Sequence, residues 1–159
     1  MSAVIKTSDI YIRPMVEQDV TSIISIEKNA YDFPWGQTIF QDCLRSGYSS
    51  WVIENNQTLI SYGVMLITSD ESHILNLCVH PDYQSMGIGK QLLEHFLGLA
   101  ERHNIQRVFL EVRPTNFKAI SLYTGMGFNE IGKRRDYYPT KIGREDALIL
   151  AKTLLKEDL

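Results

Sequence analysis

The sequence predicts an α/β fold organised around one β-α-β unit. Residues 74–79 form an almost uninterrupted apolar run that is short enough for a buried strand. Apolar residues then recur at helical spacing over residues 88–100, and a second strand-like run follows at 107–112. Because a strand, a crossover helix and a strand follow one another, the two strands should be parallel, with the helix covering one face of the sheet.

Length and composition are those of one globular domain, which we expect to span residues 1–159. Hydrophobic residues make up 44% of the chain and charged residues 22%, and the net charge of -3 argues against general nucleic-acid binding. No apolar run reaches membrane-spanning length, and the N-terminus lacks a signal-peptide pattern. We therefore expect a cytoplasmic protein with no membrane partner.

The cysteines and histidines give no support to a metal or redox site. The two cysteines, Cys43 and Cys78, both stand in apolar surroundings and form no Cys-x-x-Cys pair. The four histidines lack the spacing of metal ligands. Reduced, buried thiols and the absence of a metal are the expectation.

Alternating and helical patterns define the elements that precede the β-α-β unit. The first helix has a weak start, because Val16 cannot cap it with its side chain. Gly47 ends the second helix, and residues 55–57 form a turn between two strands. The expected elements are a strand at 10–14, helices at 16–30 and 39–44, and strands at 50–54 and 60–68.

Glycines and prolines divide the part of the chain that follows the β-α-β unit. Pro114 ends the second strand of that unit, and Gly125 and Gly127 break the helix that comes next. Gly143 lies in a loop between two final strands. The expected elements are a helix at 116–124 and strands at 128–138 and 146–153.

The turn from strand to helix carries the string VHPDYQSMGIGK, residues 79–90, and the helix starts near Gly87. Its glycines let backbone N–H groups approach a ligand closely, and the helix N-terminus adds partial positive charge, which suits a phosphate. A Walker loop is excluded because Gln84 stands where that loop needs glycine. A dinucleotide fingerprint fails at Leu92 for the same reason. Plain turn chemistry remains the alternative.

Two side chains in the second half of the chain allow both a structural and a chemical interpretation. A carboxylate in the apolar strand at Glu111 is costly unless it is paired or used. It either forms a salt bridge, to Arg113 or to a lysine, or serves as a general base for an amine. On the next helix, Tyr123 shares a face with apolar residues and on periodicity alone would be a packed core tyrosine.

Two aromatic segments also remain open. Phe33 and Trp35 flank a proline between the first two helices, where they either line a binding surface or pin the loop to the core. Basic and aromatic residues mix over 133–140, which is typical of a solvated hairpin and less so of an RNA-binding surface.

Several strings together resemble the Gcn5-related N-acetyltransferase (GNAT) family. The string Q-x-x-G-x-G at 84–89, preceded by V-x-P-x-Y, resembles its acetyl-coenzyme A loop, and N-x-x-A-x-x-L-Y at 116–123 resembles its second cofactor motif. The strings FPW at 33–35, RRDYYP at 134–139 and GREDA at 143–147 are similar to the bacterial branch that acetylates the N-terminal alanine of a small-subunit ribosomal protein. The similarity covers about residues 12–150.

This resemblance implies the GNAT fold, a mixed, twisted sheet of about seven strands with helices on both faces, splayed open between the strands of the β-α-β unit. It implies direct acetyl transfer from acetyl-coenzyme A to the N-terminal α-amino group of a protein, with the N-terminus of a ribosomal protein as acceptor. In that reaction Glu111 would be the base and Tyr123 the acid. No metal and no nucleic acid would take part, and the chain would be a monomer or weak oligomer.

The resemblance also assigns the binding residues. Those expected to hold the coenzyme are Leu77, Cys78, Val79, Gln84, Ser85, Met86, Gly87, Ile88, Gly89, Lys90 and Asn116. Those expected at the acceptor are Phe33, Trp35 and Tyr138. The chain departs from the family pattern at Ser85 and Met86, where a basic or amide residue is common, and at Gly36, which leaves the second helix weakly capped.

Two other functions stay open at this point. One is acetylation of a small amine such as a polyamine or aminoglycoside, which carboxylates near the acceptor would favour; Asp70 and Glu71 are the nearest pair. The other is a coenzyme-binding module without catalysis, against which the presence of both Glu111 and Tyr123 speaks.

Overall fold

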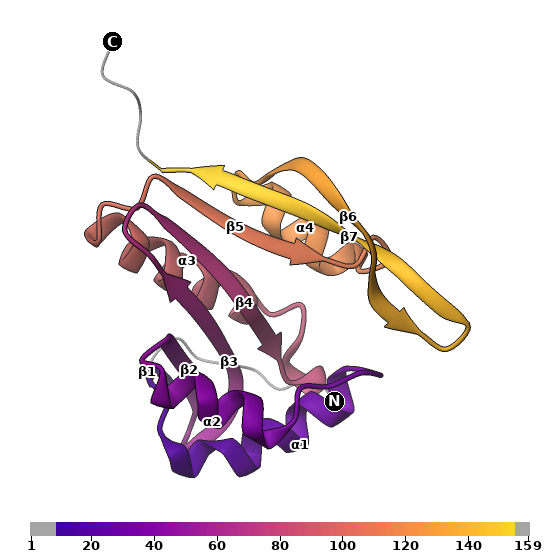
Figure 1. Ribbon diagram of the computed structural model, residues 1–159. Coiled ribbons are helices and arrows are strands. Elements are labelled where there is room, and N and C mark those ends of the chain that lie inside the picture. The colour runs from indigo at the N-terminus through magenta and orange to yellow at the C-terminus, as the bar shows by residue number, and fades with distance from the viewer. Residues whose placement is uncertain (1–8, 155–159) are drawn as a thin grey trace. The chain divides into compact units, whose positions relative to one another are not determined.

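A computed structural model describes residues 9–154 of the chain (Figure 1). These residues divide into two compact units, unit 1 with residues 9–66 and 76–96 and unit 2 with residues 67–75 and 97–154. The seven strands have the order β1-β2-β3-β4-β5-β7-β6 in one mixed sheet, which confirms the predicted α/β class. The expectation of a single domain over residues 1–159 stays a prediction.

The bounds of the elements follow the predicted ones closely in the first two thirds of the chain. The strands are β1 (Ile10–Pro14), β2 (Ser49–Asn55), β3 (Thr58–Ile67), β4 (Glu71–Val79), β5 (Arg107–Val112), β6 (Asn129–Thr140) and β7 (Gly143–Thr153). The helices are α1 (Val20–Ala30), α2 (Gln37–Arg45), α3 (Ile88–Arg102) and α4 (Phe117–Gly125), with short 3₁₀ turns at Glu17–Asp19 and Pro81–Tyr83.

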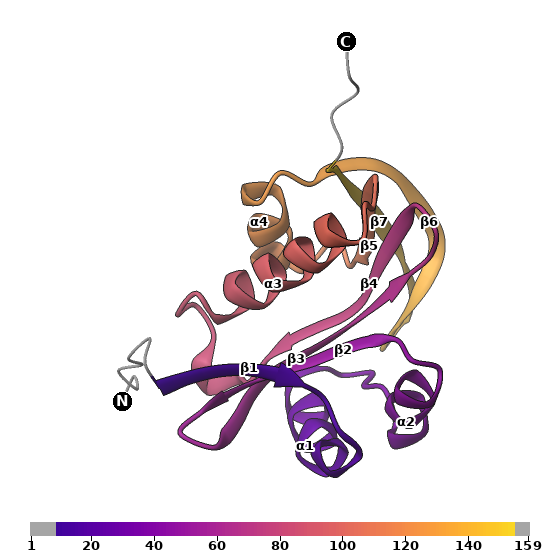
Figure 2. The ribbon, with the colours of Figure 1, turned by 90° about the vertical axis from the view of Figure 1, so that its left-hand side faces the viewer.

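In unit 1, α1 and α2 lie on one face of β2 and β3 and the first part of α3 lies on the other (Figure 2). A Cβ atom added at Gly63 would lie 2.6 Å from Phe96 Cε2, so glycine allows α3 to pack closely on β3. The residues buried under α1 and α2 are Met15, Val20, Ile23, Ile26, Phe40, Cys43, Val52, Tyr62, Val64 and Cys78. Both cysteines are therefore buried and free, as predicted.

The first helix begins differently from the prediction. The chain forms a 3₁₀ turn at Glu17–Asp19 and enters α1 only at Val20. The Asp19 carboxylate accepts a hydrogen bond from the Val16 N–H at 2.8 Å and pairs with Arg13 at 2.8 Å. Burial alone would raise the pKa of Asp19, but these hydrogen bonds outweigh it and lower that pKa. A side chain three residues into the turn thus supplies the stabilisation that Val16 cannot.

In unit 2, the parallel pairing of β4 with β5 runs from Glu71 opposite Arg107 to Ile74 opposite Leu110. This confirms the parallel strands of the predicted β-α-β unit. Strand β7 pairs antiparallel with both β5 and β6, and α4 lies on one face of β5 and β7 (Figures 1 and 2). The expected opening between the later parts of β4 and β5 stays a prediction.

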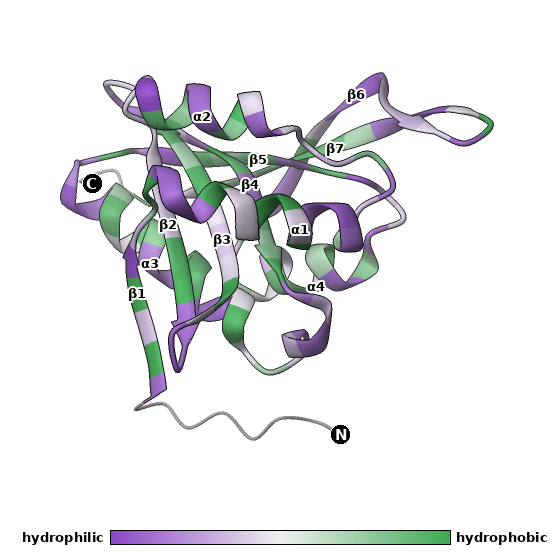
Figure 3. Ribbon diagram, turned by 90° about the horizontal axis from the view of Figure 1, so that it is seen from below, coloured by the Kyte–Doolittle hydropathy of each residue, from purple (hydrophilic) through white to green (hydrophobic). Residues whose placement is uncertain are grey.

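The predicted loop around Gly143 is wrong, because β6 and β7 extend to Thr140 and Gly143 and leave only a two-residue turn. The predicted strand stopped at Tyr138, before Pro139, a residue that cannot donate to a strand ladder. Here β6 is the last strand of the sheet, where proline is tolerated. The turn between β6 and β7 is coloured green, for hydrophobic residues, in Figure 3, and Ile142 within it is 99% exposed.

Candidate active site

The glycine loop lies between β4 and α3, within unit 1. At its start, the His80 ring Nδ1 accepts a hydrogen bond from the Asp82 N–H at 3.0 Å. Further on, the Gln84 side-chain amide donates to the Val79 carbonyl at 3.2 Å. Ser85 and Gly87 both have positive φ angles, +64° and +82°. These contacts and two left-handed residues turn the chain sharply into α3.

The start of α3 combines the backbone donors of a helix N-terminus with open space beside Gly87. The first N–H groups of an α-helix have no acceptor within the helix, and the first turn of α3 contains no acidic residue. A Cβ atom added at Gly87 would meet no atom within 4 Å. Ile88 is buried and anchors the helix start, whereas Lys90 is exposed. The loop therefore has the charge, donors and room that a phosphate group requires.

The end of β4 presents backbone groups at residues 77–79. The Cys78 carbonyl accepts a hydrogen bond from the buried Ser61 hydroxyl at 2.7 Å, so it already has a partner within unit 1. The Leu77 carbonyl accepts a longer bond from the Tyr31 hydroxyl at 3.4 Å. A carbonyl oxygen has two lone pairs, so these groups can still accept from a ligand.

The Cys78 thiol is a poor nucleophile. Its side chain is 3% exposed, and burial raises the pKa of Cys78 to about 11, which outweighs the hydrogen bonds that lower it. The thiolate, and not the thiol, is the nucleophilic form. At neutral pH this cysteine is a packed core residue, which agrees with the expectation of direct transfer.

Replacing Cys78 with alanine is expected to leave kcat close to the wild-type value, because the thiol carries no acetyl group during turnover. Steady-state rates of the variant test this. Intact-protein mass spectrometry after rapid quenching is the second measurement, and an acetyl group trapped on Cys78 would contradict the expectation.

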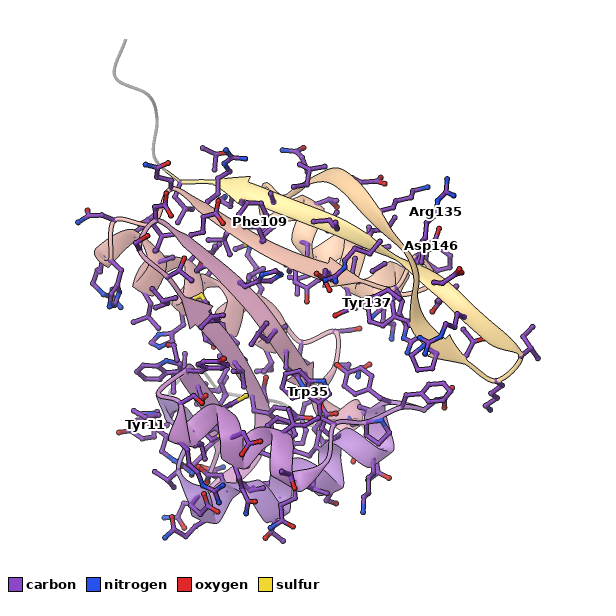
Figure 4. All side chains as sticks on the ribbon, viewed as in Figure 1. Tyr11, Trp35, Phe109, Arg135, Tyr137 and Asp146 are labelled. Carbon is purple, nitrogen blue, oxygen red and sulfur yellow. The ribbon has the colours of Figure 1, made fainter. Side chains whose placement is uncertain are left out.

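The two aromatic residues of the loop between α1 and α2 behave differently. The ring of Trp35, labelled in Figure 4, packs on Phe40 at a centroid distance of 5.3 Å, and the Trp35 backbone N–H donates to the Glu27 carboxylate at 2.9 Å. Phe33 is 43% exposed. Trp35 thus anchors the loop to the core while it stays partly exposed, and Phe33 has the larger exposed surface. The predicted acceptor role of both residues stays a prediction. Gly36 caps α2 with no side-chain hydrogen bond, as expected.

Sequence reasoning missed Glu27, a buried carboxylate on α1 that is 1% exposed. It accepts hydrogen bonds from Tyr62, Asn76 and Trp35, each at 2.9 Å. Position 27 follows Ile23 by four residues, so it lies on the apolar face of the helix. A charged residue on that face was the signal available in the sequence.

In unit 2, Glu111 on β5 is paired, but not with the predicted partner. Its Oε1 atom lies 2.9 Å from Arg134 Nη1 and 3.8 Å from His73 Nε2, and its side chain is 14% exposed. Arg113 instead pairs with Glu145 at 2.8 Å. Because neighbouring residues on a strand point to opposite faces, residues 111 and 113 share a face. They do not pair with each other, since Glu111 pairs with a residue of β6 and Arg113 with a residue of β7.

A bulge in β6 sets the orientation of Tyr137 and Tyr138. Between Arg134 and Tyr138, three residues of β6 face the single residue Asp146 of β7, whose carboxylate accepts from the Asp136 N–H at 3.0 Å. Arg135 and Tyr137 point to opposite sides of the hairpin (Figure 4). The irregular register therefore decides which aromatic rings face which arginine.

Each of these tyrosines stacks under an arginine that is itself paired with a carboxylate. Arg134 lies 4.4 Å from the centre of the Tyr137 ring, and Arg113 lies 4.4 Å from that of Tyr138. Burial, together with the charge of Glu111, raises the pKa of both tyrosines. Both phenols therefore stay protonated at neutral pH and can donate hydrogen bonds.

The two α4 residues singled out from the sequence have structural contacts as well. The Asn116 Oδ1 atom accepts from the Ala119 N–H at 3.2 Å and so caps the helix, a bond that leaves the Nδ2 group uninvolved. Tyr123 is buried, and its ring lies 5.9 Å from that of Phe128. Unit 1 thus carries the glycine loop and the aromatic loop, and unit 2 carries Glu111, Tyr123, Asn116 and Tyr138.

A match to the acetyltransferase (GNAT) family covers residues 17–128. The chain belongs to this family. A curated relative, [ribosomal protein bS18]-alanine N-acetyltransferase of Escherichia coli strain K12, is 38% identical over 133 residues, which cover 84% of this chain and 90% of the relative. With this membership, the predicted GNAT fold and acetyl-coenzyme A as cosubstrate are confirmed.

Solved structures of GNAT proteins agree with the fold. The crystal structure of the ribosomal-protein-S18-alanine N-acetyltransferase from Escherichia coli has a TM-score of 0.86 and 36% identity, covering 94% of this chain and 98% of that chain. Ard1 from Thermoplasma volcanium has a TM-score of 0.86 and 25% identity, covering 93% of this chain and 99% of that chain. In residues 9–154, no cluster of three metal-ligating side chains occurs and no helix has the length and hydropathy of a membrane span.

Proposed function

We propose that this GNAT protein acetylates the N-terminal alanine of a small-subunit ribosomal protein. The observation that carries the proposal is the similarity to an enzyme named for that reaction on bS18. The two chains are 38% identical over a region that covers 90% of that enzyme. In this proposal the reaction takes place in the cytoplasm.

In this proposal, backbone groups and the side chain of Asn116 bind the coenzyme. Backbone N–H groups of the loop from Gln84 to Lys90 hold the pyrophosphate at the start of α3. The backbone of residues 77–79 and the Nδ2 group of Asn116 contact the pantetheine arm. The open space beside Gly87 and the cap that orients Asn116 support these assignments.

The chemistry is an aminolysis of the thioester. The acceptor nitrogen forms a bond to the acetyl carbonyl carbon, the carbon–sulfur bond breaks, and coenzyme A leaves as thiolate. An α-amino group has a pKa of about 8, so part of it is protonated at neutral pH and a base assists attack. Glu111 takes the proton from the amine, and the Tyr123 phenol donates one to the departing thiolate.

A panel of acceptors tests this function. The protein is incubated with acetyl-coenzyme A and peptides that begin with Ala, Ser, Met or Lys, together with polyamines and aminoglycosides, and products are read by mass spectrometry. We expect acetylation at the α-amino group of Ala peptides above all. Products only from small amines would show that the acceptor is a small amine and not a protein. Coenzyme binding without any product would indicate a non-catalytic module.

Replacing Phe33 with alanine is expected to raise the KM for the peptide by about tenfold, because an exposed aromatic side chain contributes contact area to an acceptor. Coenzyme affinity and the melting temperature should stay near normal. Tyr138→Ala should raise the same KM. Trp35→Ala is the contrast, since its ring packs on Phe40 and its loss should lower the melting temperature. Equal loss of coenzyme affinity in Phe33→Ala would contradict an acceptor role.

A further inference from the structure

The carboxylate of Glu27 has no part in the chemistry above, yet it is the hub of a buried hydrogen-bond network in unit 1. Its Oε1 atom accepts from the Tyr62 hydroxyl and the Asn76 amide, and its Oε2 atom accepts from the Trp35 backbone N–H, each at 2.9 Å. All three partners are donors, which matches the acceptor-only character of an ionised carboxylate. Burial raises the pKa of Tyr62, and the neighbouring Cys78 and Glu27 side chains raise it further, so the Tyr62 hydroxyl keeps the donating proton.

Burying the Glu27 carboxylate costs free energy. A buried carboxylate loses its hydration, and in a packed core an apolar residue of similar size serves stability at least as well. The position lies on the apolar face of α1, beside Ile23 and Ile26. The network is therefore better explained by what it holds in place than by its contribution to stability.

What it holds are two segments already assigned to ligands. Trp35 belongs to the loop between α1 and α2, whereas Asn76 immediately precedes residues 77–79 at the end of β4. One carboxylate oxygen of Glu27 thus binds the loop proposed to contact the acceptor, and the other binds the strand proposed to contact the coenzyme. The Tyr31 hydroxyl adds a weaker link from the same loop to the Leu77 carbonyl at 3.4 Å.

We propose that Glu27 is a positioning residue that fixes the loop of residues 31–36 to the end of β4 and thereby sets acceptor affinity. The proposal rests on the proposed function for its kinetic consequence only. The tie between the loop and the strand can be measured without any acceptor.

The three partners differ in a way that makes substitutions informative. The Tyr62 hydroxyl can rotate to accept, and the Asn76 amide can flip to present its oxygen, but the Trp35 backbone N–H can only donate. Glutamine at position 27 therefore keeps the network by turning its oxygen to Trp35. Leucine fills a similar volume and offers no acceptor.

The kinetic test compares Glu27→Leu, Glu27→Gln and Tyr62→Phe with the wild type. Glu27→Leu should raise the KM for an Ala-terminated peptide by about tenfold or more, with a smaller change in kcat and an unchanged Kd for acetyl-coenzyme A. Glu27→Gln should restore the wild-type KM, and Tyr62→Phe, which spares the bond to Trp35, should resemble the wild type. A wild-type KM in Glu27→Leu, or an equal rise in all three variants, would overturn the proposal.

Hydrogen exchange of the Trp35 amide provides a readout that needs neither activity nor a folded variant. In the wild type this amide should exchange at least about 100-fold more slowly than the amides of Asp32 and Phe33 in the same loop. Equal exchange rates would overturn the tie, even if peptide acetylation is confirmed. Slow exchange of the wild-type Trp35 amide would support it even if the acceptor proves to be a different amine.

Discussion

Replacing Gly87 with valine is expected to lower the affinity for acetyl-coenzyme A by about 100-fold or more while the protein stays folded. Gly87 has a φ of +82°, a conformation that β-branched residues rarely adopt, so the loop must shift. The new side chain would also fill the open space in front of the helix start. Loss of two charge-assisted hydrogen bonds to a phosphate accounts for a change of this size. Isothermal titration calorimetry measures it.

Gly47 provides a matched control for the backbone strain. It follows α2 with a φ of +74°, and a Cβ atom there would also meet nothing within 4 Å. Gly47→Val should therefore lower the melting temperature as much as Gly87→Val does, and leave coenzyme affinity unchanged. Ser85→Gly, which keeps the backbone N–H, should also bind normally. Normal affinity in a folded Gly87→Val protein would show that the phosphate lies elsewhere.

Local signals in the sequence were sufficient for the β-α-β unit and the glycine loop. Apolar periodicity gave both strands and the helix between them, and the change of period at Gly87 located the loop. The turn at Asn56 and Gln57, which both have positive φ, was also visible as a cluster of turn residues. These features depend on residues close together in the chain, which is why a sequence reveals them.

Contacts between distant residues were beyond such reasoning. Glu111 pairs with Arg134, 23 residues away, and not with Arg113, because the bulge in β6 changes the register of the hairpin. Apolar periodicity gives no sign of this bulge, in which the Asp136 N–H donates to the Asp146 carboxylate on the opposite strand. Glu27 is different, since a carboxylate on an apolar helix face is readable and should be treated as a signal.

The Glu111→Gln variant is expected to lower kcat by roughly 10²–10⁴ at neutral pH, the range for loss of a general base, with coenzyme affinity unchanged. Glutamine keeps an oxygen for Arg134, so the local structure should survive. Glu145→Gln is the matched control, because Glu145 is also paired with an arginine at 2.8 Å and is 21% exposed against 14% for Glu111. That variant should lose little kcat, and a similar loss would assign the effect to charge in the hairpin.

The pH profile of kcat then separates a base from a structural carboxylate. Glu111→Gln should recover part of its rate as pH rises past about 8, because the acceptor amine becomes free base without assistance. Tyr123→Phe should lower kcat without such recovery, since alkali cannot donate a proton to the departing thiolate. A carboxylate that only orients Arg134 would give a loss that does not depend on pH. Wild-type turnover of Glu111→Gln across the whole pH range would remove Glu111 from the mechanism and leave the base to another group, with Glu71 as the next residue to replace.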